Sequence, residues 1–239
     1  MPFFYYGQTI HNTLDIIVEM CHNLLRGEKI EMNDGLTEIV AISDKSGSME
    51  PLTKDTIGGY NTFIKEQKAV PGEAILSTVL FSIGREKILH NRVNIKNVRS
   101  ITELEYLTDD ETALLGALGR AINHIGMVLN NTHEDEKPSK VIFFIIMAGE
   151  ENASKQFSND QIKQMVELQR NIYSWEFLFM GANIDAFSVA ESMGIQRDRS
   201  FNYTAKLVEN AQIAMSEAIS NFRQYGNVYK GKDFRKKIK

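Results

Sequence analysis

The sequence contains little cysteine, little proline and no long apolar run. Its 239 residues include a single cysteine, Cys21, and four prolines. One cysteine excludes an internal disulfide framework and is typical of a reducing compartment, so we expect a cytoplasmic protein. Four prolines and the lack of any long biased segment argue against an internal domain boundary.

Membranes and nucleic acids are not expected among the partners of this chain. The longest nearly continuous apolar run, VIFFIIMAG at 141–149, has less than half the length of a membrane span. Acidic residues and histidines interrupt the first apolar residues, so we expect no secretory signal. The net charge of −4 is mild, and a field this weak gives no reason to expect nucleic acid. Basic residues gather only in the last ten positions, KGKDFRKKIK, which we expect to form a solvated tail.

Strand and helix patterns alternate from residue 36 onward. The strand-like segments are TEIVAIS, EAILSTVLFS, KILHNRVNI, VIFFIIMAG, WEFLFMGAN and SFNYT. The helix-like segments are IGGYNTFIKEQ, ALLGALGRAINHIGMVLNN, NDQIKQMVELQRNI, AFSVAESMG and a last one around residues 208–225. This rhythm predicts an α/β fold with a doubly wound, mostly parallel sheet and helices on both of its faces.

An amphipathic helix is predicted near the N-terminus. Its apolar residues recur at spacings of four, three, four and three: Ile10, Leu14, Ile17, Cys21 and Leu24. This stripe must be buried on its own domain or on another chain, and the sequence leaves that choice and the oligomeric state open. We divide the chain into an aromatic segment and helix at 1–35, an α/β domain at 36–226 and a basic tail at 227–239.

Oxygen-bearing side chains gather where the predicted strands end, which is where open α/β sheets bind ligands. Asp44, Ser46 and Ser48 alternate directly after the run TEIVA, and Gly47 lets the backbone turn tightly between them. Thr112 precedes the long helix. One carboxylate with several hydroxyls suits Mg²⁺ or Mn²⁺, which are hard ions that prefer oxygen ligands.

Each of these features also has a purely structural interpretation. The D-x-S-x-S segment could be a strand-to-helix turn capped by its own side chains, and Thr112 could be the N-cap of the long helix. Gly58 and Gly59 suggest a close approach of a helix to the sheet, because no phosphate-binding glycine motif is present. Asn183 and Asp185 follow the WEFLF strand and could orient the loops of the ion site, but we expect them to form a turn and a helix N-cap.

Five motifs in this order resemble the von Willebrand factor type A (vWA) domain, and most closely its compact intracellular branch in bacteria and phages. They are DKSGS after a buried strand, TIGGYNTFIKEQ, TALLGALGRAI, VIFFIIMAGEENAS and WEFLFMGANIDA, within a match over about residues 37–222. The resemblance implies a Rossmann-like vWA fold with a metal-ion-dependent adhesion site (MIDAS). In that family the site binds Mg²⁺ or Mn²⁺, and a carboxylate of a protein partner completes the metal shell.

The resemblance assigns the metal ligands residue by residue. Asp44, Ser46 and Ser48 match the first loop of the adhesion site, and Thr112 matches the threonine of the second. The third loop of the family normally reads threonine-aspartate-glycine, but here Ala148 stands where the aspartate is expected. Losing a carboxylate predicts weaker metal binding.

Other acidic side chains could compensate for Ala148 through water. Those nearest in the sequence are Asp110, Glu111, Glu150 and Glu151. The predicted function is therefore a Mg²⁺- or Mn²⁺-dependent protein-binding module with a weakened site. The alternative is a metal-free scaffold or interaction protein that uses the same face.

An enzyme is not expected. The sequence has no G-x-S-x-G segment to present Ser46 as a nucleophile. A phosphatase using Asp44 would need a second aspartate where Ser46 stands. The five histidines are scattered without the spacing of metal ligands. A hydrolase or phosphatase therefore ranks below both binding functions.

Overall fold

The computed structural model describes residues 33–82, 85–108, 112–149, 154–204 and 208–229. Several sequence predictions lie outside these ranges. They concern the N-terminal helix with Cys21, most of the basic tail, and the four acidic residues that could compensate for Ala148.

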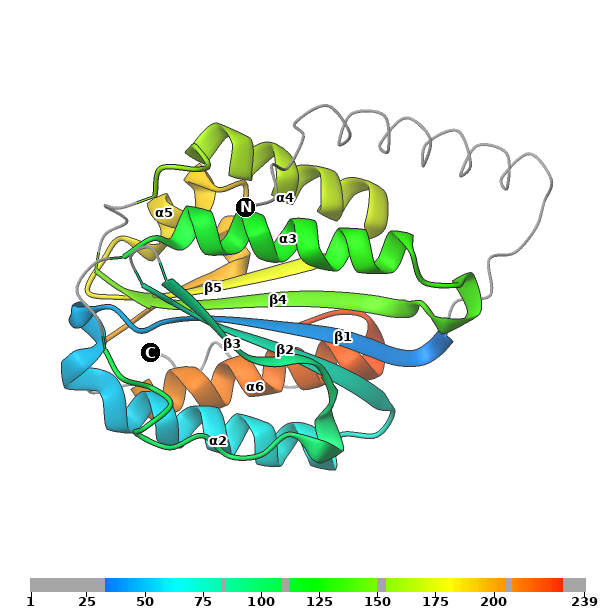
Figure 1. Ribbon diagram of the computed structural model, residues 1–239, viewed down its shortest axis with the longest axis horizontal. Helices are drawn as coiled ribbons and strands as arrows, with labels where there is room; N and C mark the ends of the chain where they lie inside the picture. The colour runs from blue at the N-terminus through cyan, green and yellow to red at the C-terminus, as the bar shows by residue number, and fades with distance from the viewer. Residues whose placement is uncertain (1–32, 83–84, 109–111, 150–153, 205–207, 230–239) are drawn as a thin grey trace.

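The described strands form one sheet of six in the order β3-β2-β1-β4-β5-β6 (Figure 1). β2 and β3 form an antiparallel pair, and every other neighbouring pair is parallel. The predicted α/β class and mostly parallel sheet are therefore confirmed. The strands are β1 (Asn33–Asp44), β2 (Glu73–Ser82), β3 (Arg85–Asn94), β4 (Pro138–Ala148), β5 (Glu176–Ala182) and β6 (Ser200–Tyr203).

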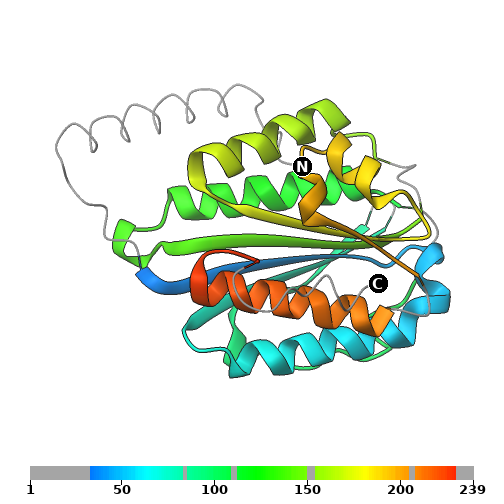
Figure 2. The same cartoon turned by 180° about the vertical axis from the view of Figure 1, so that it is seen from behind.

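Five α-helices in the described ranges cover the two faces of this sheet. One face carries α3, α4 and α5, and the other carries α2 and α6, as both views show (Figures 1 and 2). Their bounds are α2 (Thr53–Ala69), α3 (Leu114–Asn130), α4 (Asn159–Tyr173), α5 (Ala186–Ser192) and α6 (Val208–Tyr225). None of the helices within these ranges has both the length and the apolar character needed to cross a membrane.

The central strands bury side chains on both faces. Along β1, Ile39 and Ala41 belong to the core under α2 and α6, while Val40 and Ile42 belong to the core under α3, α4 and α5. Successive side chains of a strand point to opposite faces, so a strand covered on both sides must be apolar throughout. This explains why β4 reads as one continuous apolar run.

Gly59 allows α2 and α6 to pack closely. A Cβ atom on Gly59 would lie 1.1 Å from Oε1 of Gln212 on α6, whereas one on Gly58 would meet nothing within 4 Å. The expectation that both glycines serve a helix-to-sheet approach is therefore wrong. Of the two glycines only Gly59 makes a close contact, and it is with the side chain of Gln212 on α6.

An ion pair between a buried carboxylate and a partly exposed arginine lies midway along β1. Glu38 is fully buried, and its Oε2 accepts a hydrogen bond from Nε of Arg92 on β3 at 2.9 Å. The pairing of β2 with β3 shifts register here, and Arg92 takes a left-handed backbone conformation with φ of 52°. Such a bulge redirects a side chain, and the Arg92 backbone N–H donates to Oγ of Ser77 at 3.0 Å. Burial raises the pKa of Glu38 to about 7, although Arg92 lowers it.

Candidate functional site

The first loop of the site begins where β1 ends, at Asp44. This carboxylate is fully buried. Its Oδ1 accepts a hydrogen bond from the backbone N–H of Ser46 at 2.7 Å, and its Oδ2 accepts one from the N–H of Ala148 at 3.2 Å. Asp44 thus holds its own turn in shape and ties that turn to the end of β4.

The two serines of the first loop differ in exposure. Ser46 is fully buried, and its hydroxyl has no hydrogen-bond partner among the described residues. Ser48 is exposed at the surface. A Cβ atom on Gly149 would lie 2.6 Å from the Ser48 hydroxyl, and Gly149 has a φ of +79° that favours glycine. The loops that follow β1 and β4 are therefore in contact. Of the two serine hydroxyls in the first loop, that of Ser46 lies in the interior and that of Ser48 lies at the surface.

Thr112 lies one residue before the N-cap of α3. The N-cap is Ala113, which has no side-chain oxygen, so the expectation that Thr112 caps this helix is wrong. The backbone of Ala113 has a φ of −125° and a ψ of 59°, and the helix begins only at Leu114. Thr112 is buried, and α3 begins at the same edge of the sheet at which β1 ends (Figure 1).

The segment after β5 has the structural role that its sequence predicts. Asn183 adopts a left-handed turn conformation with φ of 59°. Asp185 is the N-cap of α5, and its carboxylate accepts hydrogen bonds from the backbone N–H of Ser188 at 3.2 Å and from its hydroxyl at 2.7 Å. Both residues are thus accounted for by the turn and the helix end.

Tyr106 is part of the site although nothing in its local sequence marks it. Its ring is buried, and its hydroxyl donates a hydrogen bond to the backbone carbonyl of Asp44. Burial and the nearby Asp44 charge raise the pKa of Tyr106, so its hydroxyl remains a donor at neutral pH. The contact joins residues 62 positions apart, which only the folded chain reveals.

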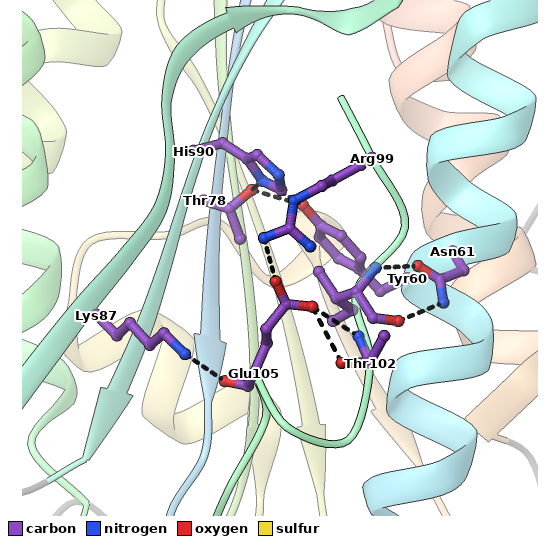
Figure 3. A network of polar contacts seen from close by, with 9 residues as sticks. Tyr60, Asn61, Thr78, Lys87, His90, Arg99, Thr102 and Glu105 are labelled. Carbon is purple, nitrogen blue, oxygen red and sulfur yellow. Dashed lines mark hydrogen bonds and ion pairs between the residues drawn. The ribbon is translucent and has the colours of Figure 1, made fainter. Parts of the chain in front are cut away.

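A network of polar contacts fixes the loop that carries Tyr106 (Figure 3). The side chain of Asn61 on α2 bonds the backbone of Ile101 twice, at 2.8 and 3.0 Å. Glu105 pairs with Arg99 and accepts from the backbone N–H of Thr102 at 2.9 Å. Loops held at several points keep their functional groups in one geometry.

Two exposed leucines flank Tyr106 on this fixed loop. The exposed fraction is 81% for Leu104 and 65% for Leu107. Single exposed leucines are common on protein surfaces. These two, however, stand in the sequence on either side of a tyrosine whose hydroxyl bonds the carbonyl of Asp44.

The side-chain oxygens of the first loop are of the kind that a hard cation prefers. In the part of the chain that is described, no three His, Cys, Asp or Glu side chains gather as a metal cluster. The first loop offers one carboxylate and two hydroxyls, and hard cations such as Mg²⁺ bind such oxygens while retaining several waters. The unpartnered Ser46 hydroxyl beside Asp44 is consistent with a missing ligand.

Two surface hollows lie along α2. One of about 190 Å³ is lined by Lys54, Gly58 and Gln212 among others, and a more open one of about 670 Å³ by Asn61 and Lys65 among others. Neither includes a residue of the first loop. The candidate site is therefore distinct from both hollows.

The comparisons with known proteins bear on the fold alone. No protein-family profile and no curated protein matches this chain. Among solved structures it is similar to proximal thread matrix protein 1 of the mussel byssus, with a TM-score of 0.53 and 13% identity over 76% of this chain and 45% of that one. It is also similar to the pilus adhesin SpaC from Lactobacillus rhamnosus GG in its open conformation, with a TM-score of 0.55 and 12% identity over 77% of this chain and 30% of that one. The chain thus spans less than half the length of these proteins.

Proposed function

We propose that the chain is a vWA-type protein-binding module whose partner docks at the carboxyl edge of a doubly wound sheet. Two independent lines support this proposal. The motifs that resemble the family occur in the family's order along the chain. The described sheet is mostly parallel with helices on both faces, an arrangement that such a domain requires.

The observation that carries the metal-dependent form of the proposal is the Ser46 hydroxyl. Buried hydroxyls are nearly always hydrogen-bonded, yet this one has no partner in the described ranges and lies two residues from a buried carboxylate. A cation held by Asp44, Ser46, Ser48 and Thr112 would supply the missing contact. Mg²⁺ or Mn²⁺ there would provide a positive centre that a partner's carboxylate completes.

The surroundings of the site suit a protein partner. Ser48 is exposed, so a ligand reaches the first loop from solvent. Leu104 and Leu107 are exposed on the loop that carries Tyr106, whose hydroxyl bonds the carbonyl of Asp44, and they would offer apolar contact to a partner. A partner with an acidic side chain next to an apolar one would match both features.

A metal-free scaffold remains the second candidate function, and Asp44 supplies its support. Each Asp44 oxygen already accepts a backbone N–H bond, so the carboxylate is stabilised without a cation. Ala148 removes the second carboxylate that the family places here. In this form the same edge would bind by shape and hydrogen bonds.

The proposal also includes a non-enzymatic role in the cytoplasm. The single cysteine and the resemblance to intracellular vWA proteins support it. The proposed partner is a protein, and neither nucleic acid nor a membrane is included.

The deciding experiment follows thermal unfolding while Mn²⁺ or Mg²⁺ is added. A ligand that binds only the folded chain raises the melting temperature, so the wild-type protein should be stabilised and Ser46→Ala should lose most of that effect. Ser46→Ala suits this test because the hydroxyl makes no bond within the described structure. Asp44→Asn should abolish the effect as well.

Ser139→Ala is the matched control. Its hydroxyl is also buried without a partner, but it lies at the start of β4, at the opposite edge of the sheet. This variant should respond to Mn²⁺ as the wild-type protein does. If the wild-type protein shows no response to either ion, the metal-free scaffold replaces the metal-dependent form. Chelator should then leave partner binding unchanged.

A further inference from the structure

The hydroxyl of Tyr203 is a second buried oxygen without a partner near the candidate site. Tyr203 ends β6, and its side chain is 4% exposed. Its oxygen has no hydrogen-bond partner among the described residues. Buried tyrosine hydroxyls usually find a partner, so this one calls for a ligand or a water.

The register of the sheet places Tyr203 in line with the position of the missing aspartate. Ala148 on β4 pairs with Ala182 on β5, and Ala182 pairs with Tyr203 on β6. All three belong to the core under α2 and α6. Neighbouring strands are only about 4.8 Å apart, and the two alanines carry just a methyl group each. A tyrosine at the end of this row therefore has room to extend across the strands toward β1.

The electrostatics agree with this placement. Burial is the larger cause that raises the pKa of Tyr203, and the charge of Asp44 raises this pKa further. Tyr203 and Asp44 also both raise the pKa of Tyr106, whose hydroxyl contacts the Asp44 carbonyl. The two phenol groups and the carboxylate are thus within electrostatic reach of one another.

We propose that Tyr203 is a positioning residue of the cation site and substitutes for the aspartate that Ala148 replaces. The inference rests on the proposed metal-dependent function. A phenol hydroxyl both donates and accepts a hydrogen bond, so it can hold a water of the cation shell over the small side chain of Ala148. It brings no negative charge, so such a site binds the cation more weakly than one with a second carboxylate.

The test is calorimetric titration of the full chain with Mn²⁺, comparing the wild-type protein with Tyr203→Phe. Phenylalanine keeps the ring that packs in the core and removes only the oxygen. We expect the affinity for Mn²⁺ to fall about tenfold. We also expect the melting temperature in chelator to stay the same or rise, since a buried hydroxyl without a partner is costly.

Tyr60→Phe is the matched control. Tyr60 is also buried, but its hydroxyl is bonded to Thr78 at 2.6 Å and to His90 at 3.2 Å (Figure 3). Its removal should lower the melting temperature and leave the affinity for Mn²⁺ unchanged. If Tyr203 had only a structural role, Tyr203→Phe would leave the affinity for Mn²⁺ unchanged, as Tyr60→Phe is expected to do.

The possible outcomes separate this inference from the proposal on which it rests. If the wild-type protein and Tyr203→Phe bind Mn²⁺ equally well, the role of Tyr203 is refuted and the metal site stands. If the wild-type protein binds no Mn²⁺, the metal-dependent function fails, and this inference fails with it. A tyrosine absorption change on Mn²⁺ addition that is reduced in Tyr203→Phe but kept in Tyr60→Phe would support it further.

Discussion

Replacing Glu38 with glutamine should remove much of the pH dependence of stability between pH 4.5 and about 7. Burial raises the pKa of Glu38 from 4.5 to about 7, despite the neighbouring Arg92. A carboxyl group with a higher pKa in the folded chain stabilises the fold fully below pH 4.5, and this contribution is lost as the pH rises to about 7. Each pKa unit corresponds to about 1.4 kcal/mol, so ionisation of Glu38 should lower the free energy of unfolding by about 3 kcal/mol.

Urea denaturation at a series of pH values on either side of this window measures the effect. The wild-type protein should lose stability as the pH rises, and Glu38→Gln should show a much flatter profile, because an amide does not ionise in this range. Its oxygen can still accept the bond from Arg92. Glu73→Gln is the control: Glu73 is 52% exposed and pairs with Lys96, so its removal should leave the slope unchanged. Equal slopes in the wild-type protein and Glu38→Gln would refute the reasoning.

Two further predictions concern packing and charge. Gly59→Ala should displace the buried amide of Gln212, which lies 1.1 Å from the position of the new Cβ, so this variant should be less stable than Gly58→Ala, in which helix propensity should raise the free energy of unfolding by up to about 1 kcal/mol. Urea denaturation measures both, and equal effects would contradict the role of Gly59 in the α2–α6 contact. Ala148→Asp should strengthen Mn²⁺ binding about tenfold or more, which is about 1.4 kcal/mol. In the presence of chelator, where no metal is bound, Ala148→Asp should lower the free energy of unfolding, because position 148 is buried and its backbone N–H contacts the Asp44 carboxylate. An unchanged calorimetric titration would show that the missing carboxylate does not limit metal binding.

The sequence predicts the secondary structure well because most of it is determined locally. The apolar run of β4 is long enough to be recognised alone, and its burial on both faces follows from the helices predicted around it. The helix predicted at residues 159–172 coincides closely with α4, whose N-terminus has a capping box formed by Ser158 and Gln161. An apolar run and a capping box depend only on residues a few positions apart in the sequence.

The parts of the site that the sequence does not predict depend on contacts between distant segments. Tyr106 reaches Asp44 across 62 positions, and Tyr203 is in line with Ala148 only because β5 lies between them. Gly59 is explained by Gln212, a residue of the last helix. Local spacing allows Thr112 as an N-cap, but the helix begins at Leu114 and its N-cap is Ala113. A motif locates the ligand candidates, whereas the sheet register shows which distant residues lie in line with them.

The edges of the sheet limit how this protein can associate with other chains. Exposed strand edges are templates onto which a foreign strand can add, and this route leads to aggregation and fibrils. At one edge β6 has only four residues, too few for a long ladder. At the other edge the bulge at Arg92 interrupts the regular pairing of β3 with β2, and bulges of this kind twist an edge strand away from a flat partner. Strand addition is thus disfavoured at both edges of the sheet that the described residues form.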